Sequence, residues 1–153
     1  MPDEIAGETA TTLMTAAREA ARRAYVPYSR FPVGAALLTD DGAIFTGCNI
    51  ENASYGLTVC AERVAIFTAA AAGYRVVRAI AVSAPRATTV SPCGACRQVL
   101  NEFVPPDGDL LVLMDAADSM VRQPLATLLP RSFGPRDLAS ASPADDASRP
   151  AEP

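Results

Sequence analysis

Cys60-Ala61-Glu62 and Pro92-Cys93-Gly94-Ala95-Cys96 supply three thiols, with a carboxylate beside the first of them. Structural zinc is usually closed by four protein ligands, whereas catalytic zinc keeps three and leaves a position for water. The chain contains no histidine, so a fourth protein ligand could only be the remaining cysteine, Cys48, or a carboxylate. Three cysteines and a neighbouring acid therefore indicate a zinc site that carries out hydrolysis.

The two motifs also predict where two helices begin. Cys93 and Cys96 are i and i+3, so at a helix start both sulfurs lie on one face. Cys60 would open the other helix, and a helix N-terminus lowers the pKa of a thiol and favours metal binding. Arg63, one turn further on, is the candidate for offsetting the charge of three thiolates by hydrogen bonds to the sulfurs. The alternative is an ordinary surface arginine.

Glu62 is the candidate for proton transfer. It follows Cys60 by two residues, about 200° around an ideal helix, so the two side chains diverge. Glu62 then reaches the pocket beside the metal rather than the metal itself, and a carboxyl group in that place can move protons during hydrolysis. The alternative is a glutamate that only complements the helix dipole.

Two other interpretations of the cysteines remain open. Cys93 and Cys96 resemble a thioredoxin-like redox pair, which also opens a helix, but that interpretation leaves the first motif unexplained. A structural site of four cysteines that includes Cys48 is the second. Cys48 adjoins Asn49, and neighbouring residues on a strand point to opposite faces. If Asn49 faces the pocket Cys48 does not, so we expect Cys48 to be a buried free thiol.

Periodicity and turn residues predict alternating helices and strands. An apolar, β-branched run at 76–83 indicates a buried strand, and Asp40-Asp41-Gly42 indicates a hairpin between two strands. The predicted elements are helices at 9–24, 60–72 and 93–103, strands at 33–39, 43–48, 76–83 and 110–114, and a last helical turn at 125–129. This order predicts an α/β sandwich with a mixed sheet.

Composition limits the classes of protein that fit. No apolar run reaches the roughly 18 residues of a membrane span. Cysteines with metal-like spacing, and an acidic N-terminus in place of a secretory signal, favour the cytoplasm. The net charge is −4 and every basic residue is an arginine, a balance that argues against binding a nucleic-acid backbone. We expect one domain over 1–138 and a disordered tail over 139–153, which is small, polar and rich in proline.

Five segments resemble the small, homotetrameric cytidine deaminases in order and spacing. They are 28–36 (YSRFPVGAA), 49–53 (NIENA), 60–63 (CAER), 92–98 (PCGACRQ) and 128–133 (LLPRSF). A Cys or His, one residue, Glu and then Pro-Cys-x-x-Cys is the pattern of the zinc deaminases. The resemblance runs from about residue 10 to about residue 138.

This resemblance implies a fold, a cofactor and a reaction. The fold is a three-layer α/β/α sandwich with a mixed sheet, and Cys60, Cys93 and Cys96 hold one Zn²⁺. The reaction is hydrolytic deamination of cytidine and deoxycytidine to uridine and deoxyuridine in pyrimidine salvage, with release of ammonia. A zinc-activated hydroxide attacks the base, and Glu62 is the proton shuttle.

Further residues are expected to bind the nucleoside. Asn49 and Glu51 are i and i+2 at the end of a strand, so both face one way, and by resemblance they hold the ribose 3′-OH. Phe31 is expected to stack on the base or flank the sugar, and the peptide N–H of Ala61 is a candidate base contact. Resemblance places Phe133 over the active site of a neighbouring subunit in a homotetramer with shared sites. The alternatives are turn-forming polar residues for the first pair, and aromatics of the chain's own core for the two phenylalanines.

The expected partner is a small nucleoside, with no nucleic acid and no membrane. Three other functions remain open. The zinc machinery would also suit a related aminopyrimidine nucleoside, such as a nucleoside antibiotic. An editing deaminase acting on nucleic acid is disfavoured by the absence of lysine and the few aromatic residues. A zinc-stabilised binding module would have no activity.

Overall fold

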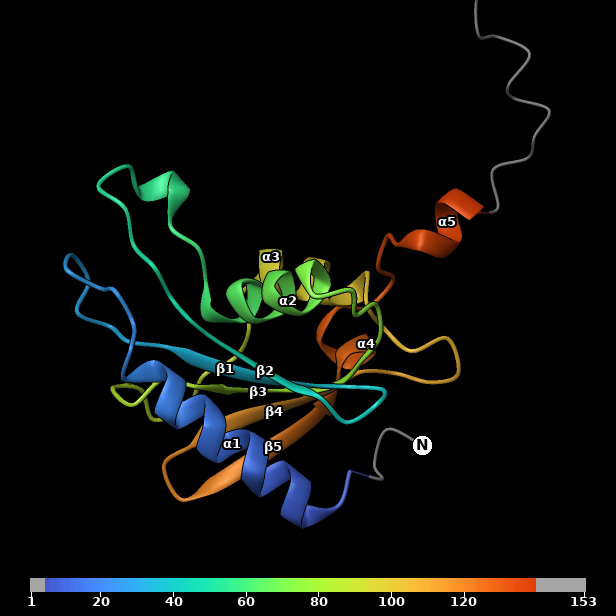
Figure 1. Cartoon of the computed structure of the whole chain (residues 1–153), viewed down its shortest axis with the longest axis horizontal. Coiled ribbons are helices and arrows are strands. Elements are labelled where there is room, and N and C mark those ends of the chain that lie inside the picture. The colour runs from blue at the N-terminus through green and yellow to red at the C-terminus, as the bar shows by residue number, and fades with distance from the viewer. Residues whose placement is uncertain (1–4, 140–153) are drawn as a thin grey trace, which may run out of the picture.

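A five-stranded mixed sheet lies between helices on both of its faces in the computed structural model, which describes residues 5–139 (Figure 1). The helices are α1 (Gly7–Ala21), α2 (Ala61–Ala71), α3 (Gly94–Asn101), α4 (Leu125–Leu128) and α5 (Pro135–Ala139), with a 3-10 turn, η2, at Tyr55–Leu57. The strands are β1 (Gly34–Thr39), β2 (Ile44–Cys48), β3 (Val77–Ser83), β4 (Leu111–Ala116) and β5 (Ser119–Pro124). Helix α1 covers one face of the sheet, and α2 and α3 cover the other. The predicted three-layer α/β/α sandwich is confirmed.

The order of the strands is β2-β1-β3-β4-β5. Strands β3 and β4 are parallel, and the other neighbours are antiparallel, so the sheet is mixed as predicted. The apolar run predicted at 76–83 forms β3 at the centre of the sheet. Asp40-Asp41-Gly42 joins β1 to β2, and Gly42 takes a φ of 90°, a left-handed conformation that glycine adopts without strain.

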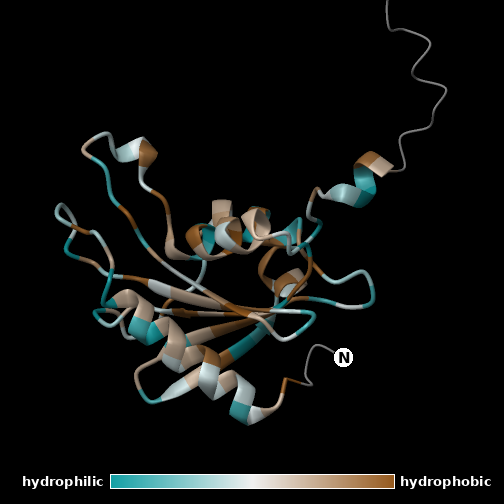
Figure 2. Ribbon diagram, in the orientation of Figure 1, coloured by the Kyte–Doolittle hydropathy of each residue, from teal (hydrophilic) through white to brown (hydrophobic). Residues whose placement is uncertain are grey.

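Alternation along the strands divides the core into two layers. Side chains of β1, β3 and β4 that face α2 and α3 are mostly large, whereas several of those facing α1 are alanines. The first set is Ala35, Leu37, Ile80, Val82, Val112 and Met114, and the second is Ala36, Ala79, Ala81, Leu111 and Leu113. Figure 2 shows the hydrophobic colouring concentrated on the central strands.

Two glycines allow helices to lie directly on the sheet. At Gly47 in β2, a Cβ atom would lie 2.5 Å from the carbonyl oxygen of Ala61 and from the nitrogen of Ala65. A Cβ on Gly34 in β1 would collide with the backbone of α1. The contact at Gly47 bears on the site because it sets the position of the first turn of α2, where the first cysteine motif lies.

Three elements of the structure have no counterpart in the sequence prediction: η2, β5 and α5. Strand β5 is an edge strand whose side chains are exposed or half-buried, so it lacks the apolar alternation by which strands are recognised. The first helix spans Gly7–Ala21 rather than 9–24, so it begins two residues earlier and ends three residues earlier than expected. No helix within residues 5–139 is long and apolar enough to cross a membrane.

The expected disordered tail, 139–153, lies outside the described residues except for Ala139, which ends α5. Its disorder stays a prediction, as does the domain boundary at residue 138.

Candidate functional site

Three cysteines from two helices meet at one point. Cys60 is the N-cap residue of α2, Cys93 is the N-cap residue of α3, and Cys96 lies in the first turn of α3. Their sulfur atoms all lie within 4.8 Å of one another. Cys48, at the end of β2, is not part of this group; it is a free thiol as expected, but half-buried rather than buried. Packing of α2 beside α3 therefore brings together the two motifs that are far apart in the sequence.

The spacing of the sulfurs fits a zinc ion. Two thiolates on a tetrahedral Zn²⁺, each with a Zn–S bond of about 2.3 Å, lie roughly 3.8 Å apart. The Sγ atoms of Cys60 and Cys93 are 3.9 Å apart. Cys96 is buried, Cys60 is half-buried and Cys93 is exposed, so the group opens to solvent on one side. Three sulfur donors with one open side match the donor set of a catalytic zinc site.

The charges around Cys60 favour its thiolate. The thiol of Cys96 donates to Cys60 Sγ and, together with the Arg63 guanidinium and the Cys93 thiol, lowers the pKa of Cys60 to about 5. The pKa of Cys96 is raised in turn, because its proton is shared with the Cys60 thiolate and because the side chain is buried. A bound Zn²⁺ takes the place of such shared protons and deprotonates all of its thiol ligands.

Arg63 lies against the sulfurs, as the sequence suggests it could. Its Nη2 atom is 3.5 Å from Sγ of Cys60. Its Nε atom is buried and makes no hydrogen bond within residues 5–139. The guanidinium therefore contributes positive charge next to the thiolates rather than on the outer surface.

Glu62 is a buried carboxyl group beside the three thiols, with 4% of its surface exposed. Burial raises the pKa of Glu62 above its ordinary value, and the negative charge of Cys60 raises it further. A carboxyl group with a raised pKa can both accept and donate a proton near neutral pH, which is what an acid/base catalyst requires.

A hollow of about 220 Å³ opens onto these groups. It is lined by Phe31, Val33, Asn49, Thr58, Cys60, Ala61, Glu62, Val90, Ser91 and Cys93. Six of the residues predicted from the sequence thus line one hollow. The sequence interpretation missed the side chains of Val33, Thr58 and Val90. Of these, Thr58 had a signal, since in an extended segment it is i−2 to Cys60 and faces the same way.

Asn49 lines the hollow and also braces its wall. Its Oδ1 atom accepts a hydrogen bond from the backbone N–H of Val33 at 2.8 Å, and its Nδ2 donates to the carbonyl of Phe31 at 2.9 Å. An amide group has two N–H donors and two acceptor lone pairs, so one of each remains for a ligand.

Glu51 faces an adjoining hollow rather than the same one. Its Oε1 accepts hydrogen bonds from the backbone N–H groups of Tyr28 and Ser29, at 3.0 and 3.1 Å. The hydroxyl of Ser29, followed by these N–H groups, lowers the pKa of Glu51. The adjoining hollow, of about 380 Å³, is lined by Tyr28, Ser29, Glu51, Tyr55 and Thr58. The two hollows meet at Thr58.

Phe133 lines neither hollow of its own chain, and 62% of its surface is exposed. Its carbonyl oxygen accepts hydrogen bonds from Gln98 and Asn101 on α3, at 2.9 and 3.0 Å. The expected role of Phe133 in the site of a neighbouring subunit stays a prediction.

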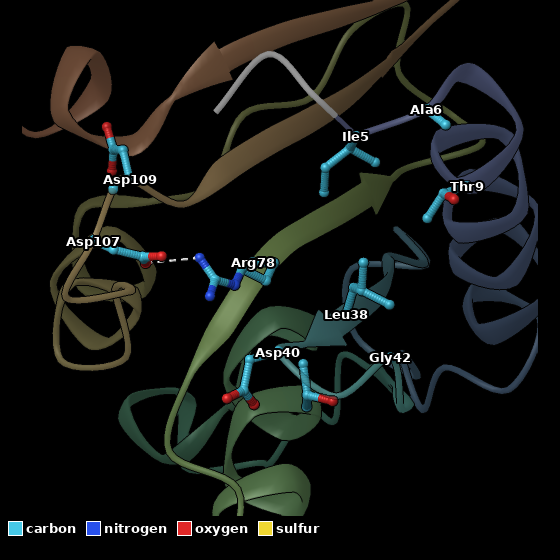
Figure 3. A pocket seen from close by; sticks show the side chains of 11 residues that line it. Ile5, Ala6, Thr9, Leu38, Asp40, Gly42, Arg78, Asp107 and Asp109 are labelled. Carbon is cyan, nitrogen blue, oxygen red and sulfur yellow. Dashed lines mark hydrogen bonds and ion pairs between the residues drawn. The ribbon is translucent and has the colours of Figure 1, made fainter. Parts of the chain in front are cut away.

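A larger hollow, of about 520 Å³, lies at the other end of the sheet (Figure 3). It lies beside Leu38 and Arg78, whereas the cysteine site lies beside the opposite ends of β1 and β3. Arg78 forms an ion pair with Asp107 at 2.8 Å there. Neither cysteine motif contributes a side chain to its lining, so size does not make it the catalytic site.

Comparison with known proteins points to the same chemistry. Residues 7–108 match the family described as the cytidine and deoxycytidylate deaminase zinc-binding region. The chain is 48% identical over 131 residues to the cytidine deaminase of Sporosarcina psychrophila. The aligned region covers 85% of this chain and 95% of that protein.

Solved structures agree with this match. The crystal structure of cytidine deaminase from Burkholderia pseudomallei superimposes with a TM-score of 0.74 at 48% identity, over 80% of this chain and 98% of that one. The crystal structure of cytidine deaminase from Mycobacterium tuberculosis superimposes with a TM-score of 0.70 at 44% identity, over 81% of this chain and 96% of that one.

Proposed function

The chain belongs to the cytidine and deoxycytidylate deaminase family, and on that premise we propose that it hydrolyses cytidine and deoxycytidine to uridine and deoxyuridine, with release of ammonia. It is a zinc-dependent deaminase, and therefore a hydrolase. The observation that carries the proposal is the meeting of a buried carboxyl group, Glu62, with a cluster of three thiols, two of which line the same hollow as Glu62.

Cys60, Cys93 and Cys96 would hold the zinc ion, with the Arg63 guanidinium against Cys60 offsetting part of the thiolate charge. When bound, zinc supplies a Lewis acid that makes water acidic enough to act as a nucleophile near neutral pH.

Glu62 performs the proton transfers. Its carboxylate accepts a proton from the attacking water and delivers a proton to N3 of the base, while the water oxygen forms a bond to C4. Glu62 then takes the remaining proton from the new C4 hydroxyl and hands it to the amino group. The C4–N4 bond breaks as the C4=O double bond forms, and ammonia leaves. Water and cytidine thus give uridine and ammonia, and the carboxyl group returns to its starting state. Burial of Glu62 supports this role because it keeps the pKa high enough for both directions of transfer.

Phe31, Asn49, Ala61 and Glu51 bind the nucleoside. The base enters the hollow that holds Glu62, where Phe31 and the Ala61 N–H are within the lining. The sugar extends past Thr58 toward Glu51 in the adjoining hollow. Within residues 5–139, no arginine lines either hollow. A neutral nucleoside therefore fits better than a nucleotide, whose phosphate would call for a basic partner.

Exposed apolar side chains support assembly into a homotetramer with shared sites. Large aromatic and aliphatic residues on η2, on the outer side of α2 and near the C-terminal end are left in contact with solvent in one chain. They include Tyr55 at 75%, Leu57 at 66%, Phe67 at 50% and Phe133 at 62% exposure. Apolar surface of this extent marks an interface with another protein, and a tetramer would cover it with further copies of the chain.

A nucleoside substrate also supports a place in pyrimidine salvage. Zinc-binding thiols support a reducing compartment such as the cytoplasm.

A substrate panel tests the proposed function. Cytidine, deoxycytidine, cytosine, deoxycytidine monophosphate and a cytosine-containing oligonucleotide are incubated with the protein, and loss of the cytosine absorbance is followed with and without a zinc chelator. We expect turnover of the two nucleosides alone, abolished by the chelator. Inertness toward both nucleosides would reject the proposed activity, and turnover of the oligonucleotide would replace it by editing of nucleic acid.

A further inference from the structure

Arg97 lies in α3 directly after a candidate zinc ligand, and its guanidinium donates hydrogen bonds to three acceptors on two separate segments of the chain. Its Nε donates to the carbonyl of Pro92 at 2.7 Å, its Nη2 to the hydroxyl of Ser91 at 2.9 Å, and its Nη1 to the carbonyl of Leu128 at 2.7 Å. Every nitrogen of the guanidinium is thus engaged, and the group is half-buried.

Two of these acceptors belong to the wall of the catalytic hollow. Ser91 lines the hollow itself, and Pro92 directly precedes the lining residue Cys93. The wall belongs to the connection between β3 and α3, which is irregular apart from a bridge between Thr89 and Ala116. Irregular segments keep a fixed shape only where their polar groups are bound, and Arg97 supplies such bonds directly beside the hollow.

The third acceptor connects the wall to the C-terminal part of the described chain. Leu128 ends α4, and the segment after it is held to α3 by the bonds from Gln98 and Asn101 to the Phe133 carbonyl. Arg97 therefore fixes the wall of the hollow relative to the segment that carries Phe133.

We propose that Arg97 is a positioning residue that sets the affinity for the nucleoside by fixing Ser91 and Pro92 relative to Leu128. It acts through the wall and touches neither the three thiols nor Glu62 in any hydrogen bond within residues 5–139. This inference rests on the proposed deaminase activity. A planar guanidinium is required because only its fork reaches three acceptors in different directions, whereas an ammonium group on a shorter stem cannot.

Arg97→Lys keeps the charge and removes the fork. We expect the KM for cytidine to rise by about tenfold, the effect of losing one charged hydrogen bond, with a smaller change in kcat. Zinc content should stay at the wild-type level. Ser91→Ala, at an exposed side chain, removes one of the three bonds and should raise KM less.

The double variant tests whether Arg97 acts through Ser91. If it does, adding Ser91→Ala to Arg97→Lys should change KM little further, because the bond is already lost. Additive effects in the double variant would reject this route.

Arg75→Lys is a matched control. Arg75 also donates to two carbonyls, those of Ala70 and Tyr74 at 2.7 and 2.8 Å, but at the far end of α2 from Cys60 and outside both hollows. We expect this variant to lose stability without a change in KM. If Arg97→Lys behaves like Arg75→Lys, lowering Tm with an unchanged KM, Arg97 is only a structural residue and the proposal is wrong. Loss of zinc from Arg97→Lys would also overturn it, since the effect would then belong to the metal site.

Calorimetric binding of cytidine to the inactive Glu62→Gln protein, with and without Arg97→Lys, is independent of turnover. Weaker binding in the double variant supports the inference. Equal binding rejects it while leaving the deaminase function intact, and no binding to either protein rejects the proposed function itself.

Discussion

Replacing Glu62 by glutamine separates its chemical role from its place in the fold. The amide has nearly the same shape as the carboxyl group, so the packing of a side chain with 4% exposure should survive. A positioned acid/base group contributes about 10²–10⁴-fold to a rate. Because Glu62 would serve each proton transfer of the reaction, we expect kcat to fall by about 10⁴-fold, the upper end of that range. Zinc content and binding of a ground-state ligand should remain.

The same variant should gain stability relative to the wild type as the pH rises. Burial raises the pKa of Glu62, so the folded chain binds this proton more tightly than the unfolded chain does. The free energy of unfolding therefore falls as the pH rises from the ordinary carboxyl range, about 4, through the raised pKa. Glutamine carries no such proton and removes this loss. We expect Glu62→Gln to gain in Tm over wild type, and the gain to grow with pH across this interval.

The assay combines initial rates with cytidine, metal analysis and thermal unfolding at several pH values. Glu102→Gln, at an exposed carboxylate just after α3, controls for the loss of one negative charge. Near-normal turnover by Glu62→Gln would remove Glu62 from the mechanism. A Tm gain that shrinks as the pH rises would refute the argument from burial.

Metal analysis of the purified protein should find about one Zn²⁺ per chain. Alanine at Cys60, Cys93 or Cys96 should remove both the zinc and the turnover. Cys48→Ala should leave both unchanged. Asp115 accepts two hydrogen bonds from Arg18 and one from Ser83, and these bonds lower the pKa of Asp115. Above the ordinary pKa of an aspartate, about 3.9, Asp115→Asn should therefore lower the free energy of unfolding by about 1–2 kcal/mol. Denaturation experiments should show this difference shrinking as the pH falls below that value. Glu51→Ala should weaken action on cytidine far more than residual action on free cytosine, which has no sugar hydroxyl, and equal losses would assign Glu51 to the fold. Phe133→Ala refolded together with Glu62→Gln should regain activity if Phe133 acts in a neighbouring subunit. No recovery of activity in proven mixed oligomers would reject shared sites.

Local features of the sequence predicted much of the fold and the centre of the site. The central strand β3, the hairpin at Gly42 and the starts of α2 and α3 each depend on a short run of residues, and each is present in the structure. The zinc ion follows from residues close together within two motifs, and the family was recognised from five short segments of the sequence.

Tertiary structure alone decided the arrangement of the two side chains that we propose bind the sugar. Asn49 and Glu51 were expected side by side, but backbone groups of the chain between Tyr28 and Val33 bind both of them and draw them into adjoining hollows. Strand β5 was not predicted because it is an exposed edge strand, and its sequence therefore lacks the alternation of apolar residues that marks a half-buried strand. The ion pair between Arg18 and Asp115 joins residues 97 positions apart in the sequence.

Arg97 shows the physical reason most directly. The residue type of a cysteine indicates its chemistry, and the spacing of apolar residues indicates the buried face of a helix or strand, so both can be found in the sequence. The acceptors of Arg97 include two backbone carbonyls, which every residue possesses, and they lie in segments that only folding brings together. The sequence by itself determined which chemical groups the protein carries and where its regular elements form, whereas only the tertiary structure decided which groups hold the others in place.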